Sequence, residues 1–448
     1  MTRLFGTDGV RGRANAELTP ELALALGRAA AEVLGAGRSM RPRFVIGRDT
    51  RASGPMLEHA LVAGLLSAGA DVTLLGVLST PAVAYLTPAL AADAGVVISA
   101  SHNPAEYNGI KLIDARGRKL PDELEDRIEA AMRRDRVQDP PPSPRAVGGV
   151  ARDEAAVARY VEHLAASVDV PLGGRRVVLD CGHGAAVRTA PDAFRRLGVA
   201  VEVLNDRPDG WNINDGCGSQ HPEGLARAVV ERGAFAGFAF DGDADRCIAV
   251  DEAGRIIDGD GILAVLALDL KARGRLPGDT VVATVMSNLG LERALARAGI
   301  RLLRTRVGDR YVLEGMLASG SRLGGEQSGH VILLDHATTG DGVLTALQLL
   351  AVAARRGQPL SQLAAVVERL PQAQRNVPLP SGTKPAPESY ADAVAAAEAR
   401  LSGRGRVVVR PSGTEPVIRI LVEGEDAKEV ETTAAFLEEA ISRAAARG

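Results

Sequence analysis

The sequence predicts an α/β protein with four domains, and three observations indicate this. Strand-like runs alternate with helical runs in the βαβ rhythm of a mixed or parallel sheet. Two proline-rich passages, 139–144 and 371–387, interrupt that rhythm. The chain of 448 residues is also too long for one ordinary hydrophobic core. We therefore expect α/β domains at 1–150, 151–250 and 251–370 and a smaller α+β domain at 371–448.

The first domain begins with a clearly marked helix. Thr19 is its expected N-cap, Pro20 stands in the first turn, and Glu21 lies near the positive end of the helix dipole. Further along, the pattern predicts strands at 43–47, 71–75 and 95–98 and helices at 55–68 and just after Pro81.

The rest of the chain repeats this alternation and ends in a separate tail. Beyond residue 150 the pattern predicts helices at 154–167 and 342–354 and strands at 176–180, 235–240, 248–250, 281–285 and 302–307. In the tail it predicts a helix, strands at 406–410 and 417–422, and a last helix at 427–445. The passage 371–387 is expected to be a linker preceding that tail.

The composition is that of a soluble globular protein, with 46% hydrophobic and 24% charged residues. A net charge of −3 offers no basic field for nucleic acid, and no nucleic-acid-binding motif is present. The N-terminus lacks the apolar stretch of a signal peptide, and no apolar run reaches membrane-spanning length, so we expect a cytoplasmic protein with no membrane partner. Cys181, Cys217 and Cys247 are odd in number and far apart, which favours reduced thiols.

The segment 241–246, Asp-Gly-Asp-Ala-Asp-Arg, places three carboxylates at every second position. Carboxylates about 4 Å apart repel by roughly 4 kcal/mol per pair at an effective dielectric near 20, so their convergence indicates a bound cation. Oxygen ligands without a nearby His or Cys pair favour Mg²⁺ over Ca²⁺ or Zn²⁺. The alternative is a solvated acidic turn that binds no ion.

An EF-hand calcium loop is a second alternative, because Glu252 falls at the twelfth position counted from Asp241. Arg246, however, occupies the sixth position, where that loop needs glycine, and the flanking segments read as strands. A Mg²⁺ held by three Asp residues keeps open positions, which phosphate oxygens commonly fill. The sequence should therefore also contain phosphate-binding groups.

Ser101 is the first candidate for such a group. The apolar strand at 95–99 ends at Ala-Ser-His-Asn-Pro, and ligands gather at the carboxyl ends of strands in open α/β sheets. A phosphorylated Ser101 would supply an oxygen ligand to the metal if its loop faces the three Asp residues. A serine that only caps a turn is the alternative.

Two later loops are rich in hydrogen-bonding groups. The strand that ends at Arg410 leads into small donors and predicts an anion-binding nest, for which a hairpin connection is the alternative. Its predicted phosphate ligands are Arg410, Ser412, Gly413, Thr414 and Arg419. In the loop 324–330, Glu326 and Ser328 alternate on one edge, as a sugar's neighbouring hydroxyls require, although an ordinary turn would have the same composition.

Together these loops resemble the α-D-phosphohexomutase family, and within it the bacterial phosphoglucosamine mutases. The resemblance spans nearly the whole chain and rests on the segments 5–12, 99–111, 208–214, 217–219, 241–246, 307–312, 326–330 and 410–416. The chain departs from the family pattern at Tyr107, where an acidic residue is frequent, and at Leu112 and Ile113, which replace a more aromatic pair. These departures affect the wall beside Ser101.

The resemblance implies four domains around a central cleft, with three related α/β domains. It implies that Ser101 is a phosphoserine and that Mg²⁺ is bound by its phosphate and by Asp241, Asp243 and Asp245. It further implies that Glu326 and Ser328 hold sugar hydroxyls and that the loop 410–414 binds the non-reacting phosphate. The residues matching the family's catalytic positions are Arg11, Lys111, Arg246 and His330.

The implied activity is that of an isomerase. It interconverts glucosamine 6-phosphate and glucosamine 1-phosphate through a bisphosphorylated sugar and feeds the synthesis of UDP-N-acetylglucosamine and cell-wall precursors. A sister mutase acting on glucose or mannose phosphates is the nearest alternative, and Gln327 with the segment 307–312 favours the amino sugar. A metal-dependent phosphatase with an Asp nucleophile and a non-catalytic sugar-phosphate sensor are the others. The partner is a small sugar phosphate, and the sequence leaves a homodimer open.

Overall fold

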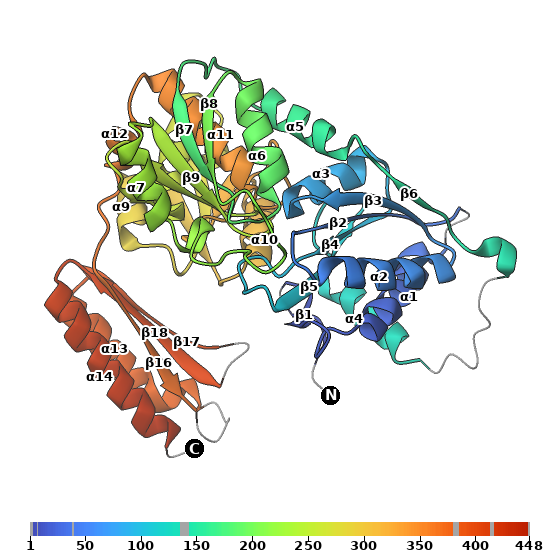
Figure 1. Ribbon diagram of the computed structural model, residues 1–448. Helices are drawn as coiled ribbons and strands as arrows, with labels where there is room; N and C mark the ends of the chain where they lie inside the picture. Colours follow the sequence, from blue (N-terminus) through green and yellow to red (C-terminus); the bar gives the residue numbers. More distant parts are fainter. Residues whose placement is uncertain are drawn as a thin grey trace.

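The computed structural model describes residues 3–6, 8–37, 40–134, 143–379, 385–412 and 416–446. Within these ranges the strands form four sheets of six, five, four and three strands, each with its own helices. Figure 1 shows the first and second sheets beside each other, with helices α9 to α12 next to the second, and the fourth sheet, with α13 and α14, set apart from them. The predicted α/β class is confirmed.

The first sheet is mixed, with the strand order β1-β5-β4-β2-β3-β6. Its elements are β1 (Val10–Arg13), α1 (Pro20–Gly35), β2 (Arg43–Arg48), α2 (Gly54–Ser67), β3 (Asp71–Val77), α3 (Thr80–Ala89), β4 (Ala94–Ile98), β5 (Tyr107–Asp114), α4 (Asp122–Met132) and β6 (Val150–Arg152). The Thr19 side chain accepts a hydrogen bond from the N–H of Leu22, which confirms the expected N-cap. All of β4 is buried in the interior of the sheet, and this explains its unbroken apolar run.

The second sheet has the order β11-β10-β9-β7-β8. Its elements are α5 (Ala156–Ala166), β7 (Arg176–Asp180), α6 (Ala186–Arg196), β8 (Ala200–Leu204), α7 (Glu223–Glu231), β9 (Ala236–Phe240), β10 (Cys247–Asp251) and β11 (Ile256–Ile257). Strands β7, β8 and β9 are parallel, whereas β10 runs antiparallel to β9. The three Asp residues therefore lie in the connection of an antiparallel pair, at the carboxyl end of β9.

The third sheet has the order β13-β12-β14-β15. Its elements are α8 (Gly259–Ala272), β12 (Thr280–Thr284), α9 (Leu289–Arg297), β13 (Arg301–Thr305), α10 (Asp309–Ser319), β14 (Leu323–Gly325), β15 (Val331–Leu333), α11 (Gly342–Arg356) and α12 (Leu360–Ala364). The loop 326–330 joins the antiparallel strands β14 and β15. It thus lies at the carboxyl end of β14.

The fourth sheet is antiparallel, with the order β16-β18-β17. Its elements are β16 (Gln372–Pro378), α13 (Ala391–Leu401), β17 (Gly405–Pro411), β18 (Val417–Gly424) and α14 (Ala427–Ala445). The prediction that 371–387 is a linker was wrong for β16, which pairs along its whole length with β18 and buries Ala373 and Val377. Residues 380–384 of that passage lie outside the described residues.

The hydrophobic clusters do not correspond one to one with the four sheets. One cluster contains buried side chains of the first, second and third sheets together, from Val45 to Leu360. A second cluster fills the other face of the first sheet, and a third belongs to the fourth sheet alone. Cys181, Cys217 and Cys247 are buried and free, as predicted. No helix within the described ranges is long and apolar enough to cross a membrane.

Candidate active site

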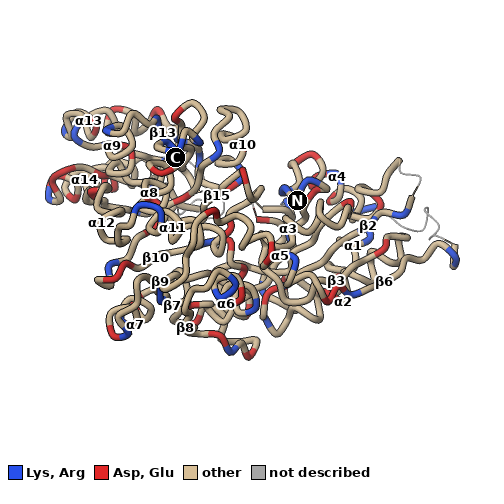
Figure 2. Tube along the Cα trace, turned by 90° about the horizontal axis from the view of Figure 1, so that it is seen from above, with Lys and Arg blue, Asp and Glu red and all other residues tan. Residues whose placement is uncertain are grey.

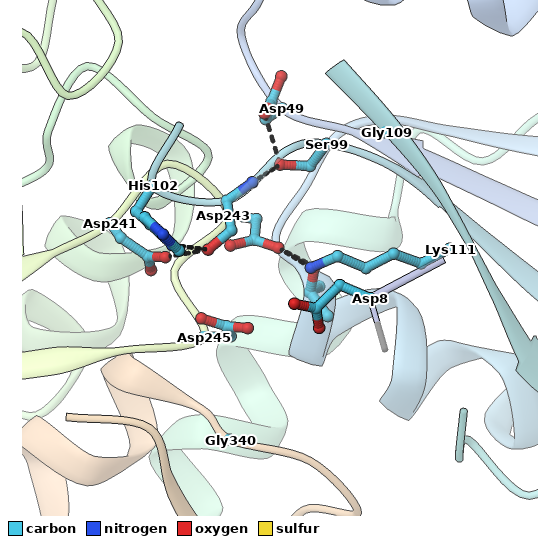
Figure 3. A network of polar contacts seen from close by, with 12 residues as sticks. Asp8, Asp49, Ser99, His102, Gly109, Lys111, Asp241, Asp243, Asp245 and Gly340 are labelled. Atoms are coloured by element: carbon cyan, nitrogen blue, oxygen red, sulfur yellow. Dashed lines mark hydrogen bonds and ion pairs between the residues drawn. The ribbon is translucent and has the colours of Figure 1, made fainter. Parts of the chain in front are cut away.

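The three Asp residues of the segment 241–246 form one buried cluster, hereafter the Asp cluster. Oxygen atoms from Asp241, Asp243 and Asp245 lie within 4.8 Å of one another. The chain turns sharply between them, because Ala244 adopts a φ of 54° and its N–H donates to the Asp241 carbonyl at 3.0 Å. Figure 3 shows the three carboxylates converging, with Lys111 reaching in from the opposite side.

Ser101 faces this cluster. It follows β4 in the first sheet, is 1% exposed, and its Oγ donates a hydrogen bond to Oδ2 of Asp241 at 2.6 Å. Nδ1 of His102 lies 3.3 Å from the same Oγ. Burial lowers the pKa of His102 to about 4, with Arg246 and Arg11 contributing, so this imidazole is neutral at physiological pH. The structure thus brings together the two loops that the sequence predicted to share a metal and a phosphate.

Asp243 is held by two donors from the first sheet. Nζ of Lys111, on β5, lies 2.6 Å from Oδ2, and the Thr80 hydroxyl at the start of α3 donates to the same oxygen at 2.6 Å. Burial alone would raise the pKa of Asp243, but the Lys111 ammonium and these hydrogen bonds hold it well below its usual range. Asp241 behaves oppositely, because burial, and then Asp245 and Asp243, raise its pKa well above the usual range.

The cluster has spare acceptors that fit a cation. Oδ1 of Asp243 and Oδ1 of Asp245 are buried and accept no hydrogen bond from the described residues. Buried carboxylate oxygens without a partner are costly, and a cation satisfies them. Because all candidate ligands are oxygens, a hard ion such as Mg²⁺ matches this donor set. Glu252 is directed elsewhere, to the N–H and hydroxyl of Ser361, which excludes the EF-hand alternative.

Arg246 and His330 lie beside the Asp cluster, next to Asp245. The Arg246 N–H donates to Oδ1 of Asp241 at 3.2 Å, and its guanidinium Nε is 3.8 Å from Oδ1 of Asp245. His330 pairs with Arg246 through the backbone, and its Nε2 accepts the N–H of Gly340 at 3.2 Å. That bond assigns the imidazole proton to Nδ1, which is buried and has no partner among the described residues.

A chain of charges that the sequence did not reveal borders the site. Arg11, on β1, lies 3.2 Å from Asp8, and Nζ of Lys119 bridges Asp8 at 2.7 Å and Asp309 at 2.6 Å. Asp309 is in turn 3.7 Å from Nε2 of His330. Asp8 and Asp309 belong to segments that carry the family resemblance, whereas no sequence signal distinguished Lys119.

The expected sugar-binding loop adjoins the segment 307–312. Oε1 of Glu326 accepts the N–H of Gly308 at 3.1 Å. Ser328 is exposed, and Gln327 is half-buried with an Nε2 that has no partner within the described ranges. The two segments that favour the amino sugar by resemblance are therefore in contact.

The expected phosphate-binding residues lie on the fourth sheet, whereas the residues around Ser101 belong to the first three. Arg410 on β17 and Arg419 on β18 stand opposite each other and line a cavity of about 100 Å³ together with Met286, which follows β12. The Ser412 N–H donates to the Val417 carbonyl at 2.9 Å. Gly413 and Thr414 lie outside the described residues.

Comparison with known proteins matches each part of the chain to one family. Models of the phosphoglucomutase/phosphomannomutase α/β/α domains I, II and III match residues 2–139, 158–254 and 258–370, and that of its C-terminal domain matches 361–440. A phosphoglucosamine mutase of Symbiobacterium thermophilum is 58% identical over 98% of this chain and 99% of its own length. One from Streptomyces griseus is 55% identical over 99% of this chain and 100% of its own.

Solved structures agree with the fold. A phosphoglucomutase/phosphomannomutase family protein of Burkholderia thailandensis has a TM-score of 0.81 and 26% identity, covering 99% of this chain and 98% of its own. The Aspergillus fumigatus N-acetylphosphoglucosamine mutase, solved with GlcNAc-6P and magnesium, has a TM-score of 0.67 and 18% identity and covers 99% and 96%. With all four family domains matched in order and a serine set against three buried aspartates, the chain belongs to the phosphoglucomutase/phosphomannomutase family.

Proposed function

We propose that this chain is an isomerase that interconverts glucosamine 6-phosphate and glucosamine 1-phosphate. The observation that carries the proposal is the hydrogen bond between Ser101 Oγ and Asp241, which places a nucleophilic hydroxyl directly on the Asp cluster. The relatives at 58% and 55% identity, both named phosphoglucosamine mutase, support the amino sugar as substrate. Their similarity covers essentially the whole chain.

Ser101 is the proposed carrier of the phosphoryl group. Asp241, Asp243 and Asp245 would hold Mg²⁺ together with a phosphate oxygen on Ser101, and the ion would supply Lewis-acid neutralisation of phosphoryl charge. Phosphoryl transfer depends mainly on positioning and on charge stabilisation. Lys111, whose pKa is raised because Asp243 and Asp245 outweigh the effect of burial, stays cationic for that purpose.

The reaction is two transfers in opposite directions. In the first, the Ser101 Oγ–P bond breaks as a bond from phosphorus to a free sugar hydroxyl forms. In the second, the other phosphate of the bisphosphorylated sugar returns to Ser101. In the first step the sugar hydroxyl loses a proton and the freed Ser101 Oγ gains one. In the second step the sugar O–P bond breaks as the new Ser101 O–P bond forms, the Ser101 hydroxyl loses its proton and the freed sugar oxygen gains one, so each step balances. Arg11 and Arg246 add positive charge beside the transferred group.

The remaining site residues hold the sugar. Glu326 and Ser328 would bind its hydroxyls, and the group at Arg410, Ser412 to Thr414 and Arg419 would bind the phosphate that does not react. One such phosphate site would serve both orientations of the bisphosphate. We also propose a cytoplasmic location and the four domain boundaries given by the sequence.

Selectivity at the sugar 2-position would come from Glu326 and Gln327. A protonated 2-amino group is rich in donors, and a site that offers it an acceptor discriminates against sugars that cannot complete the contact. We expect kcat/KM to be highest for glucosamine phosphates, lower for glucose phosphates and lowest for mannose phosphates in one coupled assay. Equal values, or a preference for mannose phosphate, would indicate the sister mutase.

The decisive experiment follows glucosamine 6-phosphate by ³¹P NMR after addition of purified protein. We expect an equilibrium mixture with glucosamine 1-phosphate and no release of inorganic phosphate. Release of phosphate would identify a phosphatase, and tight binding without conversion would identify a sensor. Ser101→Ala is the matched control and should abolish conversion while the protein remains folded.

A further inference from the structure

Ser101 has an unfavourable backbone conformation. Its φ of 51° lies in the left-handed region, which costs a non-glycine residue about 1–3 kcal/mol and persists only where the surroundings enforce it. In this conformation the Oγ points at Asp241. The contacts that enforce it therefore decide whether the hydroxyl meets the Asp cluster.

Arg51 is one source of these contacts. Its side chain is fully buried, and every one of its five N–H groups has an acceptor. Nε donates to Oδ2 of Asp49 at 2.8 Å. The other four N–H groups donate to main-chain carbonyls between β4 and the start of β5. These are the carbonyls of Ser101 at 2.9 Å, Asn103 at 2.8 Å, Pro104, and Tyr107 at 2.9 Å. The guanidinium thus fixes the path of the whole loop.

Asp49 acts on the N–H of Ser101 through Ser99. Its Oδ2 accepts the hydroxyl of Ser99 at 2.6 Å, and the Ser99 Oγ accepts the N–H of Ser101 at 2.9 Å. Figure 3 shows the bond between Asp49 and Ser99. The N–H and the C=O of Ser101 are therefore both bound by one connected group, which sets the two dihedral angles between them.

Asn214 adds a contact from the second sheet. Its Nδ2 donates to the carbonyls of Ser101 at 3.0 Å and Asn103 at 3.3 Å. Asn214 itself has a φ of 60° and is buried. The segment 208–214 carries part of the family resemblance but takes no part in the chemistry proposed above. Its contact with the Ser101 carbonyl gives this segment a role in holding the Ser101 loop.

We propose that Arg51, Asp49, Ser99 and Asn214 are positioning residues that hold Ser101 in its left-handed conformation and so aim its Oγ at the Asp cluster. This inference rests on the proposed function of Ser101 as phosphoryl carrier. None of the hydrogen bonds described above joins these four residues to the Ser101 Oγ. They act through the Ser101 backbone, so their loss should slow phosphoryl transfer without weakening sugar binding.

The test uses two mild variants and a matched control. Asn214→Gly removes the amide donor but keeps a residue suited to positive φ, and Ser99→Ala removes only a hydroxyl. The control is Asn205→Gly, because Asn205 also has a positive φ, of 51°, in the second sheet's loops, and its amide binds Asp180 instead. Arg51 itself is too deeply buried for its loss to be separated from misfolding.

We expect kcat to fall about tenfold or more in each variant, which corresponds to about 1.4 kcal/mol of lost alignment, with KM for the sugar phosphate within about twofold of wild type. Amide hydrogen exchange of 101–107 should speed up in both variants and stay unchanged in Asn205→Gly. An unchanged kcat, or equal loss in Asn205→Gly, would overturn the inference. If the wild type interconverts no sugar phosphates, the proposed function itself fails, and the two failures are thus distinguished.

Discussion

The Asp cluster is held in shape by contacts that involve no metal ion. The Asp241 carbonyl accepts the Ala244 N–H, and the Ala244 carbonyl accepts the N–H of Gly342 at 3.0 Å, which ties the turn to α11. Lys111 and Thr80 neutralise and orient Asp243 independently of any metal. We therefore expect the fold around the site to form without a metal ion.

We expect chelation by EDTA to abolish mutase activity and leave the circular dichroism spectrum nearly unchanged. Added Mg²⁺ should restore activity, because the ligand oxygens stay in place. Asp243→Asn should also lose activity, since it removes the carboxylate that pairs with Lys111 and that we propose as a metal ligand. Unfolding of the chelated protein would assign the ion a structural role, and full activity of Asp243→Asn would remove this residue from the site.

Asp260, in the first turn of α8, couples stability to pH. Burial and then the Asp258 carboxylate raise its pKa from a usual 3.8 to about 7, against the opposing effects of the Asn288 N–H and Arg304. Between these two values the folded protein binds one more proton than the unfolded chain. The stabilising contribution of Asp260 is thus complete below pH 3.8 and is lost as the pH rises towards about 7.

Asp260→Asn should remove this dependence. The free energy of unfolding is measured by denaturant from pH 4.5 to 7.5 for both proteins. As the pH rises, the wild type should lose stability relative to the variant by up to about 1.4 kcal/mol per pH unit. Parallel curves would show that the carboxyl titrates normally.

The chemistry-bearing residues were predictable where their types and spacing are unusual. Three Asp residues at alternate positions favour a metal, and a serine at the end of an apolar strand indicates a phosphate only in combination with them. Arg51, Lys119 and Asn214 carry no such signal, because buried Arg and Lys and a loop Asn look like ordinary surface residues in a sequence. The contacts Arg51–Ser101, Lys119–Asp309 and Asn214–Ser101 span 50, 190 and 113 residues of chain and arise only on folding.

At the scale of elements, α8 packs against the proposed sugar-binding loop, 326–330, at one glycine. Gly259 opens α8, and its N–H donates to the Gln327 carbonyl at 3.0 Å. A Cβ at Gly259 would lie 2.0 Å from the Glu326 carbonyl oxygen, which is main chain and can move only with the loop. The helix start therefore sets the position of the Glu326 side chain.

We expect Gly259→Ala to raise KM for sugar phosphates and to lower the unfolding free energy by about 1–3 kcal/mol through overpacking. Gly224→Ala is the control, because Gly224 lies in α7, where an added Cβ meets nothing closer than Arg227 at 4.0 Å. That change should leave KM unaltered and stabilise the helix by about 0.5–1 kcal/mol. Equal kinetics for the two variants would show that the loop tolerates the shift.

Long apolar or capped elements were predictable, and short polar ones were not. The pattern predicted β4, β7, β12, α1 and α14 closely, because burial on one or both faces leaves a clear periodicity. Strand β16 reads Gln-Ala-Gln-Arg-Asn-Val-Pro, an edge strand between prolines with two buried side chains, and so resembles a linker. Its pairing with β18 comes from the tertiary fold.

At the scale of the whole molecule, Lys119 joins the first sheet to the third. It follows β5 and binds both Asp8 near the N-terminus and Asp309 at the start of α10. Figure 2 shows acidic and basic residues interspersed along the chain. The Lys119 side chain is only 17% exposed, so its ion pairs are poorly screened. The surrounding carboxylates raise its pKa despite burial.

Lys119→Met should lower the unfolding free energy by about 3 kcal/mol, since Asp8 and Asp309 then lose the buried ammonium that bridges them. It should also reduce kcat, because Asp309 lies beside His330. Lys271→Met removes a more exposed ammonium, which pairs with Asp279 at 3.0 Å, and should cost less than about 1 kcal/mol. Urea unfolding and steady-state kinetics of both variants test this, and equal losses would contradict a bridging role.

The shared hydrophobic cluster determines how the molecule tolerates sequence change. Val83 near the first sheet and Leu347 on α11 belong to the same continuous hydrophobic cluster. A destabilising substitution at either residue therefore lowers the same unfolding free energy. Leu437 on α14 belongs to the separate cluster of the fourth sheet. Two mildly destabilising substitutions in the cluster shared by the first three sheets can therefore unfold all three together. The same two substitutions divided between Val83 and Leu437 lower the stability of each cluster by only one substitution. During evolution, substitutions in the core of the fourth sheet can therefore accumulate independently of those in the first three sheets.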